Sequence, residues 1–200
     1  MNFLRTATLA ALVCLNPLAP TTAWADQGLQ GSTTPPPMPV ALPAEQFQEV
    51  LVSVGDDLFN AGQPTEQGLR DLAAAGVSTV VNLRTHREMD DRQVVPFDEA
   101  ALVAELGLTY VHIPSGGTEN PYSPEMVERF AEALTESKGK VLLHCTVAWR
   151  ASHLYTAWLY RHGGLSLAQA VNQGQAVNLG HLPLEGFLGE RLAIDVVTSP

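Results

Sequence analysis

The chain has 200 residues and a formal net charge of −10, from 21 acidic side chains against 11 lysines and arginines. A chain of this length suits one folded domain with an appendage. The acidic balance argues against duplex nucleic acid as a partner, because that partner is itself an anion. It also repels anionic substrates at long range, so a phosphate site in this chain needs local hydrogen-bond donors.

The first 25 residues have the pattern of a cleavable export signal. One basic residue, Arg5, precedes an apolar run over residues 7–15, and small residues end at Ala25. We therefore expect cleavage before Asp26 and a periplasmic or secreted protein. The apolar run is shorter than the roughly 20 residues that a membrane-spanning helix needs, and no later segment approaches that length. No membrane span is expected.

The chain holds two cysteines, Cys14 and Cys145, and the predicted cleavage leaves only the second. The mature chain then has no internal disulfide and depends on packing for its stability. A lone thiol in an oxidising compartment needs a reason. Either Cys145 serves as a small apolar residue in the core, or it carries chemistry.

The organisation along the chain indicates one domain behind a tether. Residues 26–47 are rich in proline, with three in a row at positions 35–37, and predict an extended linker. From position 48 to 200 we expect one domain. Short runs of β-branched residues alternate there with segments whose apolar residues have helical spacing. This alternation predicts an α/β fold with a mostly parallel central sheet of four to five strands flanked by helices.

The expected elements follow in chain order. Thr65 and Ser123-Pro124 are helix-start signals, and glycines at 76, 107 and 139 are placed to stop helices. We expect polar loops at 84–93 and 114–123. The strands are expected at 51–54, 58–60, 77–83, 108–113 and 140–144, and the helices at 65–76, 97–106, 123–139, 150–161, 166–175 and 184–197.

The segment over residues 141–152 carries the chemistry. A buried strand ends at Cys145, a tight loop follows, and Arg150 opens the next helix. Backbone N–H groups at a helix N-terminus favour both a thiolate and a bound oxyanion, and the thiolate is the nucleophilic form of cysteine. The guanidinium of Arg150 can hold two phosphoryl oxygens. We therefore predict Cys145 and Arg150 as catalytic, and the backbone of Thr146, Val147, Ala148, Trp149 and Arg150 as the phosphate-binding loop.

This loop resembles the signature loop of the cysteine-dependent protein tyrosine phosphatases, in which a His-Cys pair follows a strand and an arginine lies downstream. Residues 61–65 (AGQPT), 80–84 (VVNLR) and 110–114 (YVHIP) are similar to the bacterial phosphatase-like domain named after beta-lactamase-hydrolase-like proteins. The resemblance covers about residues 48–165. It implies a dual-specificity-phosphatase-like fold, a phosphocysteine intermediate without a cofactor, and a phosphorylated protein or a small phosphate monoester as substrate. The six histidines show no metal-ligand spacing, so no metal is expected.

The loop departs from the common phosphatase pattern in three places. Four residues separate Cys145 from Arg150 where five are usual, a spacing that the bacterial group shares with rhodanese sulfurtransferases. Ala148 stands where the family usually has glycine, and alanine is strained if this position requires positive φ. Ala151 replaces the usual hydroxyl residue, and Ser152 comes one position late.

Further site residues are weaker candidates. The 114–123 loop holds no aspartate, so Glu119 is its only general-acid candidate, although a glutamate there is also an ordinary surface residue. His144 either orients the loop or is a satisfied buried residue. Arg84, with the neighbouring His86 and Arg87, either supplies positive charge at the sheet edge where ligands gather or belongs to a solvated polar loop.

Three functions stay open from the sequence. The first is an exported phosphatase, for which the strand, His-Cys, loop and Arg order is the evidence. The second is a sulfurtransferase that carries a persulfide on Cys145, which the four-residue spacing favours. The third is an inactive oxyanion-binding or partner-docking domain, which the missing aspartate and the two alanines favour.

Overall fold

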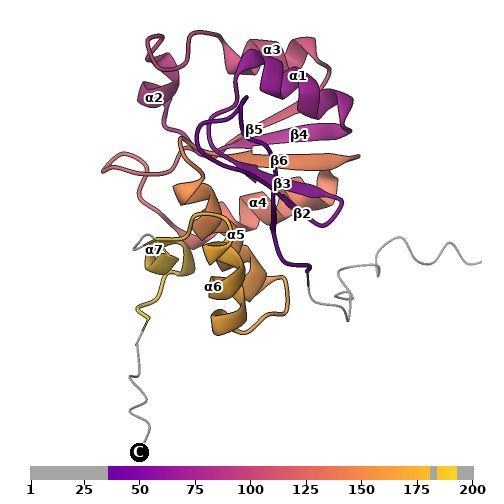
Figure 1. Ribbon diagram of the computed structural model, residues 1–200. Helices are drawn as coiled ribbons and strands as arrows, with labels where there is room; N and C mark the ends of the chain where they lie inside the picture. Colours follow the sequence, from indigo (N-terminus) through magenta and orange to yellow (C-terminus); the bar gives the residue numbers. More distant parts are fainter. Residues whose placement is uncertain (1–35, 181–183, 193–200) are drawn as a thin grey trace, which may run out of the picture. The chain divides into compact units, whose positions relative to one another are not determined.

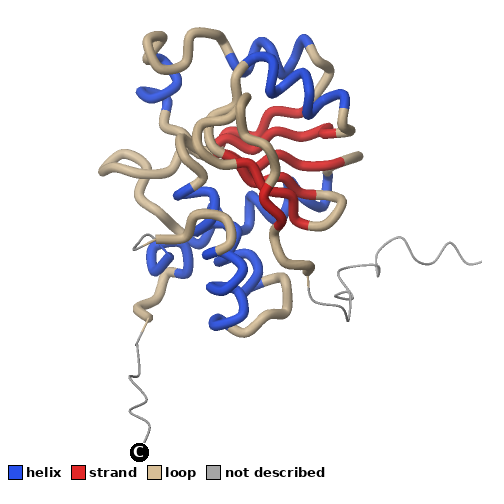
Figure 2. Tube along the Cα trace, in the orientation of Figure 1, coloured by secondary structure: helices blue, strands red, loops and turns tan. Residues whose placement is uncertain are grey.

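The protein is described by a computed structural model over residues 36–180 and 184–192, and it has the predicted α/β architecture (Figure 2). Its sheet has the strand order β1-β2-β3-β6-β4-β5. The four strands β3, β6, β4 and β5 run parallel, and β1 and β2 add an antiparallel edge. The strands are β1 (Val40–Ala41), β2 (Leu51–Val54), β3 (Leu58–Ala61), β4 (Val77–Asn82), β5 (Thr109–His112) and β6 (Lys140–His144).

Strand β1 brings the sheet to six strands, where four to five were expected, and it lies inside the segment predicted as linker. Val40 pairs with Ser53, and Ala41 pairs with Val52. Both residues of β1 are exposed. An exposed two-residue edge strand has no apolar pattern, so the sequence gives no signal for it.

The helices are α1 (Glu66–Ala74), α2 (His86–Asp90), α3 (Glu99–Glu105), α4 (Pro124–Glu136), α5 (Trp149–Arg161), α6 (Leu167–Gln175) and α7 (Leu184–Leu188). Helices α1 and α3 lie over one face of the sheet, and α4 and α5 lie over the other (Figure 1). The strands supply both cores by alternation, because successive side chains point to opposite faces. Thus Val80 and Leu142 pack towards α1 and α3, whereas Val81 and Leu143 pack towards α4 and α5.

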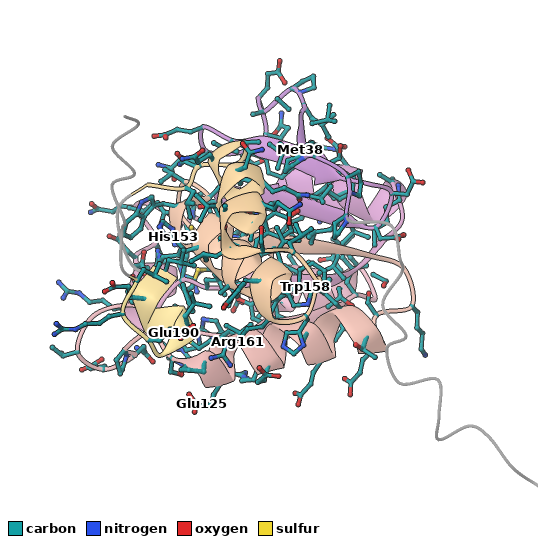
Figure 3. All side chains as sticks on the ribbon, turned by 90° about the horizontal axis from the view of Figure 1, so that it is seen from below. Met38, Glu125, His153, Trp158, Arg161 and Glu190 are labelled. Carbon is teal, nitrogen blue, oxygen red and sulfur yellow. The ribbon has the colours of Figure 1, made fainter. Side chains whose placement is uncertain are left out.

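The second helical layer is held together by contacts made from α5. The Trp158 ring lies edge-on to Phe130 of α4, with centroids 6.0 Å apart. Arg161 donates a hydrogen bond to the Leu188 carbonyl of α7 at 2.6 Å and lies 3.8 Å from Glu128 of α4. Figure 3 views this layer from below and labels Trp158 and Arg161. These contacts anchor the helix whose first turn follows the candidate nucleophile.

Most of the predicted helix boundaries are confirmed. The Thr65 side chain accepts the Gly68 N–H at the start of α1, and Pro124 is the first residue of α4. Two predictions were wrong. Part of the expected 84–93 loop forms α2, and the helix expected over 184–197 ends at Leu188, because Gly189 has φ +70°. Residues 193–197 of that prediction lie outside the described residues.

The predicted export signal and residues 26–35 of the predicted linker also lie outside the described residues. Within the part of the chain that the structure describes, no helix combines the length and apolar character needed to cross a membrane.

The register of the parallel strands sets the position of the site. His144 lies opposite Ala61 of β3 and opposite Asn82 of β4, and Asn82 lies opposite His112 of β5. The carboxyl ends of four strands therefore meet at one edge of the sheet. Ligands of open α/β sheets bind outside this edge.

Candidate active site

Cys145 lies at this edge, directly after β6, and its N–H donates to the Ala61 carbonyl at 3.4 Å. The residue is only 1 % exposed and belongs to the apolar cluster beneath α5. This burial, taken by itself, would agree with a cysteine that serves only as a small apolar residue of the core. Its surroundings are not apolar throughout, because two cations, Arg84 and Arg150, reach the same edge of the sheet.

The loop after Cys145 is anchored through its carbonyl groups. The Thr146 carbonyl accepts the Gln63 N–H at 2.8 Å, and the Val147 carbonyl accepts the Asn178 side-chain amide at 2.6 Å. Gly62 also lies against this loop, where an added Cβ would sit 2.9 Å from the Thr146 carbonyl oxygen and 1.8 Å from that of Gln48. The backbone at position 62 has no room for a side chain, which holds the loop close to the end of β3.

The amide groups of the loop are left available. Among residues 36–180 and 184–192, no protein acceptor takes a hydrogen bond from the N–H groups of Thr146, Val147, Trp149 or Arg150. Helix α5 starts at Trp149 and runs for 13 residues, so its first turn adds partial positive charge at the same place. Unpaired N–H groups at a helix N-terminus form an anion-binding site.

Ala148 is the residue that turns the chain from the loop into α5. It is the N-cap of the helix, with φ +61° and ψ 3°, and it is fully buried. A left-handed conformation costs an L-residue roughly 1–2 kcal/mol relative to glycine. Position 148 therefore does require a positive φ, which was the condition under which alanine was expected to be strained. The backbone is strained at a residue close to Cys145.

Arg150 reaches the edge of the sheet from the first turn of α5, with its side chain 11 % exposed. Its Nη1 donates to the Ser115 carbonyl at 2.8 Å, and its Nη2 donates to the Thr146 hydroxyl at 3.0 Å. Burial opposes its charge, but the hydrogen bond from Arg150 to Glu88 and the negative charge of that carboxylate outweigh burial and raise the pKa of Arg150. The guanidinium therefore stays charged.

The main partner of Arg150 is Glu88, a residue that the sequence did not single out. Both Nη atoms donate to its carboxylate, at 2.6 and 2.8 Å. Burial alone would raise the pKa of Glu88, but the bonds from Arg150 and Thr85 lower it to about 2. Thr85 and Glu88 form a capping box at the start of α2. The Thr-x-x-Glu spacing directly after β4 was the available signal.

The pair leaves one edge of the guanidinium open. Within the described residues, no protein atom accepts a hydrogen bond from Nε of Arg150. A phosphoryl group can bind the Nε edge while Glu88 holds the two Nη atoms from the other end, since a guanidinium offers five N–H donors in one plane.

The two supporting residues lie beneath the loop. His144 is fully buried, with its Nε2 3.0 Å from an oxygen of Glu99, another residue that the sequence did not single out. Arg84 is 3 % exposed and donates from Nη1 to the Gln63 side-chain oxygen at 2.8 Å, while its Nε finds no acceptor in the described part of the chain. Burial lowers the pKa of Arg84. Arg84 is therefore a buried cation near the site rather than part of a solvated loop.

A cavity of about 650 Å³ opens beside Arg150. Its walls come from α2, from the 116–122 loop and from the first turn of α5, and they include the rings of Tyr122 and Trp149. Glu119 is exposed and lines this cavity, which is compatible both with a proton donor and with an ordinary surface carboxylate. Cys145 is not among the lining residues, in keeping with its burial.

Further charged residues of the 84–93 segment line the cavity, since α2 turns them towards it. His86 and Arg87 are exposed there, and Asp91 adds a carboxylate from the end of α2. The structure thus brings Glu119, Arg87 and Arg150 to one cavity. Asp91 is a carboxylate that the sequence did not single out.

Comparison with known proteins gives a family match over most of this domain. Residues 46–186 match the family described as "DSP-PTPase phosphatase fused to NAD+ Kinase". The chain is also 29 % identical over 105 residues to a beta-lactamase hydrolase-like protein from Xylella fastidiosa (strain Temecula1 / ATCC 700964), which is 52 % of this chain. The match spans only 24 % of that relative's length.

Solved structures show the same fold. A protein from Shewanella putrefaciens CN-32 described as "Putative phosphatase (DUF442)" is 31 % identical with a TM-score of 0.50, over 64 % of this chain and 79 % of that one. The TpbA protein of P. aeruginosa, solved as a variant in complex with pTyr, is 18 % identical with a TM-score of 0.51, over 69 % of this chain and 77 % of that one. The second likeness concerns the fold alone.

Proposed function

Because this chain belongs to the DSP-PTPase phosphatase family, we propose that it hydrolyses phosphate monoesters through a phosphocysteine formed on Cys145. The match confirms the predicted resemblance, and the chain is a protein tyrosine or dual-specificity phosphatase-like hydrolase. The observation that carries the cysteine mechanism is the loop between β6 and α5. It joins the thiol to a helix start with unpaired amides and to a charged Arg150.

In the proposed reaction, the Cys145 thiolate attacks phosphorus. The S–P bond forms as the bond from phosphorus to the leaving oxygen breaks, and a general acid protonates that oxygen. Water then attacks the phosphocysteine and gives a proton to the carboxylate that the general acid has become. The S–P bond breaks, inorganic phosphate leaves, and the thiolate and the acid are both restored. The amides of residues 146–150 and the Nε edge of Arg150 hold the three other phosphoryl oxygens.

Three carboxylates line the cavity and are candidates for the general acid: Glu88, Asp91 and Glu119. Glu88 has a pKa of about 2, so it is ionised at neutral pH and has no proton to give. Glu119 lies on a loop whose Gly116 and Gly117 have positive φ, which suits a segment that closes over a ligand. We propose Glu119 as the acid, with Asp91 as the competing candidate.

The proposed substrate is a phosphorylated protein or a small phosphate monoester. The cavity has aromatic walls at Tyr122 and Trp149 and room for an aryl group. TpbA of P. aeruginosa is in complex with pTyr, which supports phosphotyrosine as the first substrate to test.

Two other functions were open from the sequence. A sulfurtransferase would gain one sulfur on Cys145 from thiosulfate, visible by intact mass and removed by cyanide. An inactive oxyanion-binding domain would gain melting temperature from vanadate without any turnover. The family match favours neither function over a phosphatase.

We also propose that the protein is exported to the periplasm or secreted, on the evidence of the pattern in residues 1–25. Cell fractionation and N-terminal sequencing test this directly. The proposal predicts Asp26 as the first residue of the exported protein. An intact Met1 in a cytoplasmic fraction would contradict it.

The phosphatase proposal is tested by hydrolysis of p-nitrophenyl phosphate by the purified chain and by Cys145→Ser. We expect turnover by the wild type and none above background by the variant, since serine at neutral pH is a far weaker nucleophile than a thiolate. Equal rates in the two proteins would remove the proposed mechanism.

A further inference from the structure

Glu99 is a buried carboxylate at the centre of the site's supporting structure. It stands in the first turn of α3 and is 1 % exposed. A buried glutamate is uncommon because burial disfavours its charge. Burial would raise the pKa of Glu99, but its interaction with His144 and the hydrogen bonds from the Gln63 and Asn82 amides outweigh burial and lower it. Glu99 is therefore an anion with no contact to solvent.

Three hydrogen-bond donors surround this carboxylate, and each comes from the carboxyl end of a different parallel strand. The Gln63 amide donates at 2.6 Å from the segment after β3. The Asn82 amide donates at 2.8 Å from the end of β4, and His144 lies at 3.0 Å on the end of β6. One anion thus ties together the strand ends that meet at the site.

The contact with His144 determines which ring nitrogen carries a proton. An ionised carboxylate is only an acceptor, so Nε2 of His144 must be the donor. In the described part of the chain, Nδ1 of the same ring has no partner, so the contact with Glu99 is the only hydrogen bond of the ring. His144 precedes Cys145, and its carbonyl accepts the Leu83 N–H at 3.0 Å. Sheet pairing thus holds the peptide that leads into the nucleophile, and the bond to Glu99 holds the side chain of the same residue.

The contact with Gln63 acts on the other side of the loop. Because the Gln63 amide nitrogen faces Glu99, its oxygen faces Arg84, whose Nη1 donates to it at 2.8 Å. The backbone N–H of Gln63 also holds the Thr146 carbonyl at 2.8 Å. The carboxylate thus orients the Gln63 side chain towards the buried arginine, while the backbone of the same residue holds the loop.

We propose that Glu99 is a positioning residue for the reaction of Cys145, acting mainly by fixing the His144 ring and secondarily by orienting Gln63. It does not touch the substrate, since it lies beneath the loop and does not line the cavity. The inference rests on the proposed phosphatase function. Because Glu99 does not touch the substrate, its effect is expected in the chemical step and not in substrate binding. Partners that orient a functional side chain without touching the substrate typically change activity by about 10–100-fold.

The experiment is Glu99→Gln, which keeps the size of the side chain and removes its charge. With p-nitrophenyl phosphate we expect kcat to fall about 10–100-fold while KM changes less than about threefold. The matched control is Tyr110→Phe. Tyr110 meets the same network through the Asn82 amide at 2.9 Å and also lies next to the Glu99 carboxylate, but it forms no bond to His144, so the kcat of this variant is expected to stay within about twofold of wild type.

A double-mutant cycle separates positioning from a general loss of structure. If Glu99 acts through His144, Glu99→Gln lowers kcat much less in a His144→Asn background than in the wild type. Full additivity of the two effects would overturn the inference, as would a Glu99→Gln enzyme with wild-type kcat. Loss of activity in Tyr110→Phe equal to that in Glu99→Gln would also overturn it.

A spectroscopic measurement on the wild type needs no turnover, and it needs a variant only to assign the His144 signal. Nitrogen-15 spectra of histidine-labelled protein report the protonation of each ring nitrogen, and His144 is assigned by its loss in His144→Asn. We expect a proton on Nε2 at neutral pH. A proton on Nδ1 alone would overturn the role of Glu99, whereas a wild type with protonated Nε2 and no turnover would overturn the proposed function instead.

Discussion

Arg150 and Glu88 form a two-point ion pair across the candidate active site, with nitrogen to oxygen distances of 2.6 and 2.8 Å. The pair joins the helix that follows Cys145 to the short helix α2, and the Thr146 hydroxyl lies 3.1 Å from the same carboxylate. Glu88 thus holds the predicted phosphate-binding arginine and the predicted phosphate-binding loop together.

This pair predicts a pH dependence of stability. The pKa of Glu88 in the folded protein is about 2, below its ordinary value of 4.5. A lowered folded-state pKa means that the contribution to stability is complete above about pH 4.5 and is lost as the pH falls towards 2. Urea unfolding should show that Glu88→Gln has a lower free energy of unfolding than wild type at pH 7. This difference in free energy should become smaller below pH 4.5. A difference independent of pH would contradict the assignment.

Arg150→Lys should lose activity because lysine offers a single point charge in place of a planar fork. Removal of one preorganised donor at a reacting oxyanion costs about 10²–10³-fold, so we expect kcat/KM for p-nitrophenyl phosphate to fall by about that factor. The matched control is Arg161→Lys on the same helix, where the arginine contacts α4 and α7 away from the cavity. Similar losses in both variants would indicate an effect on α5 as a whole.

The general-acid assignment is tested by comparing leaving groups. Glu119→Gln should reduce kcat for phosphotyrosine by about 10²–10⁴-fold, since tyrosine needs a proton to depart, and should change hydrolysis of p-nitrophenyl phosphate far less. Asp91→Asn should leave both rates close to wild type. The opposite pattern, with the leaving-group effect confined to Asp91→Asn, would transfer the role to Asp91.

Ala148 allows a prediction about strain in the loop. Ala148→Gly removes the roughly 1–2 kcal/mol cost of positive φ but also one buried methyl group, worth about 0.8 kcal/mol. Its free energy of unfolding should therefore lie within about 1 kcal/mol of wild type. Ala148→Val should lose more than about 2 kcal/mol, because a branched side chain must fit both the strained backbone and a fully buried position. A tolerated valine would contradict this account.

The sequence predicted the parts of the fold that depend on local pattern. The buried run over residues 141–143, the cap at Thr65 and the proline start of α4 all determine their elements within a few residues, and the structure confirms them. Helix α2 was missed because it is one short turn with no buried residue, so it has no apolar period. Only the Thr85 capping box marked its start.

The candidate site was predictable only where its residues are neighbours in the chain or stand at the ends of parallel strands. Cys145, Arg150 and the loop between them occupy one segment, and His144 and Arg84 stand at strand ends that the parallel sheet brings together. Glu88 lies 62 residues from Arg150, and Glu99 lies 45 residues from His144. A glutamate is expected at the surface by default, so neither contact shows in the sequence before the fold is known.

The most direct test of the central claim is the detection of a phosphoryl group on Cys145 during turnover. Wild-type protein is mixed with p-nitrophenyl phosphate, quenched in acid within the first turnovers, and the intact and peptide masses are measured. The account predicts an added phosphoryl mass on the peptide that contains Cys145, absent in Cys145→Ser. Steady turnover with an unmodified Cys145 peptide, or a phosphoryl group carried by another residue, would contradict it.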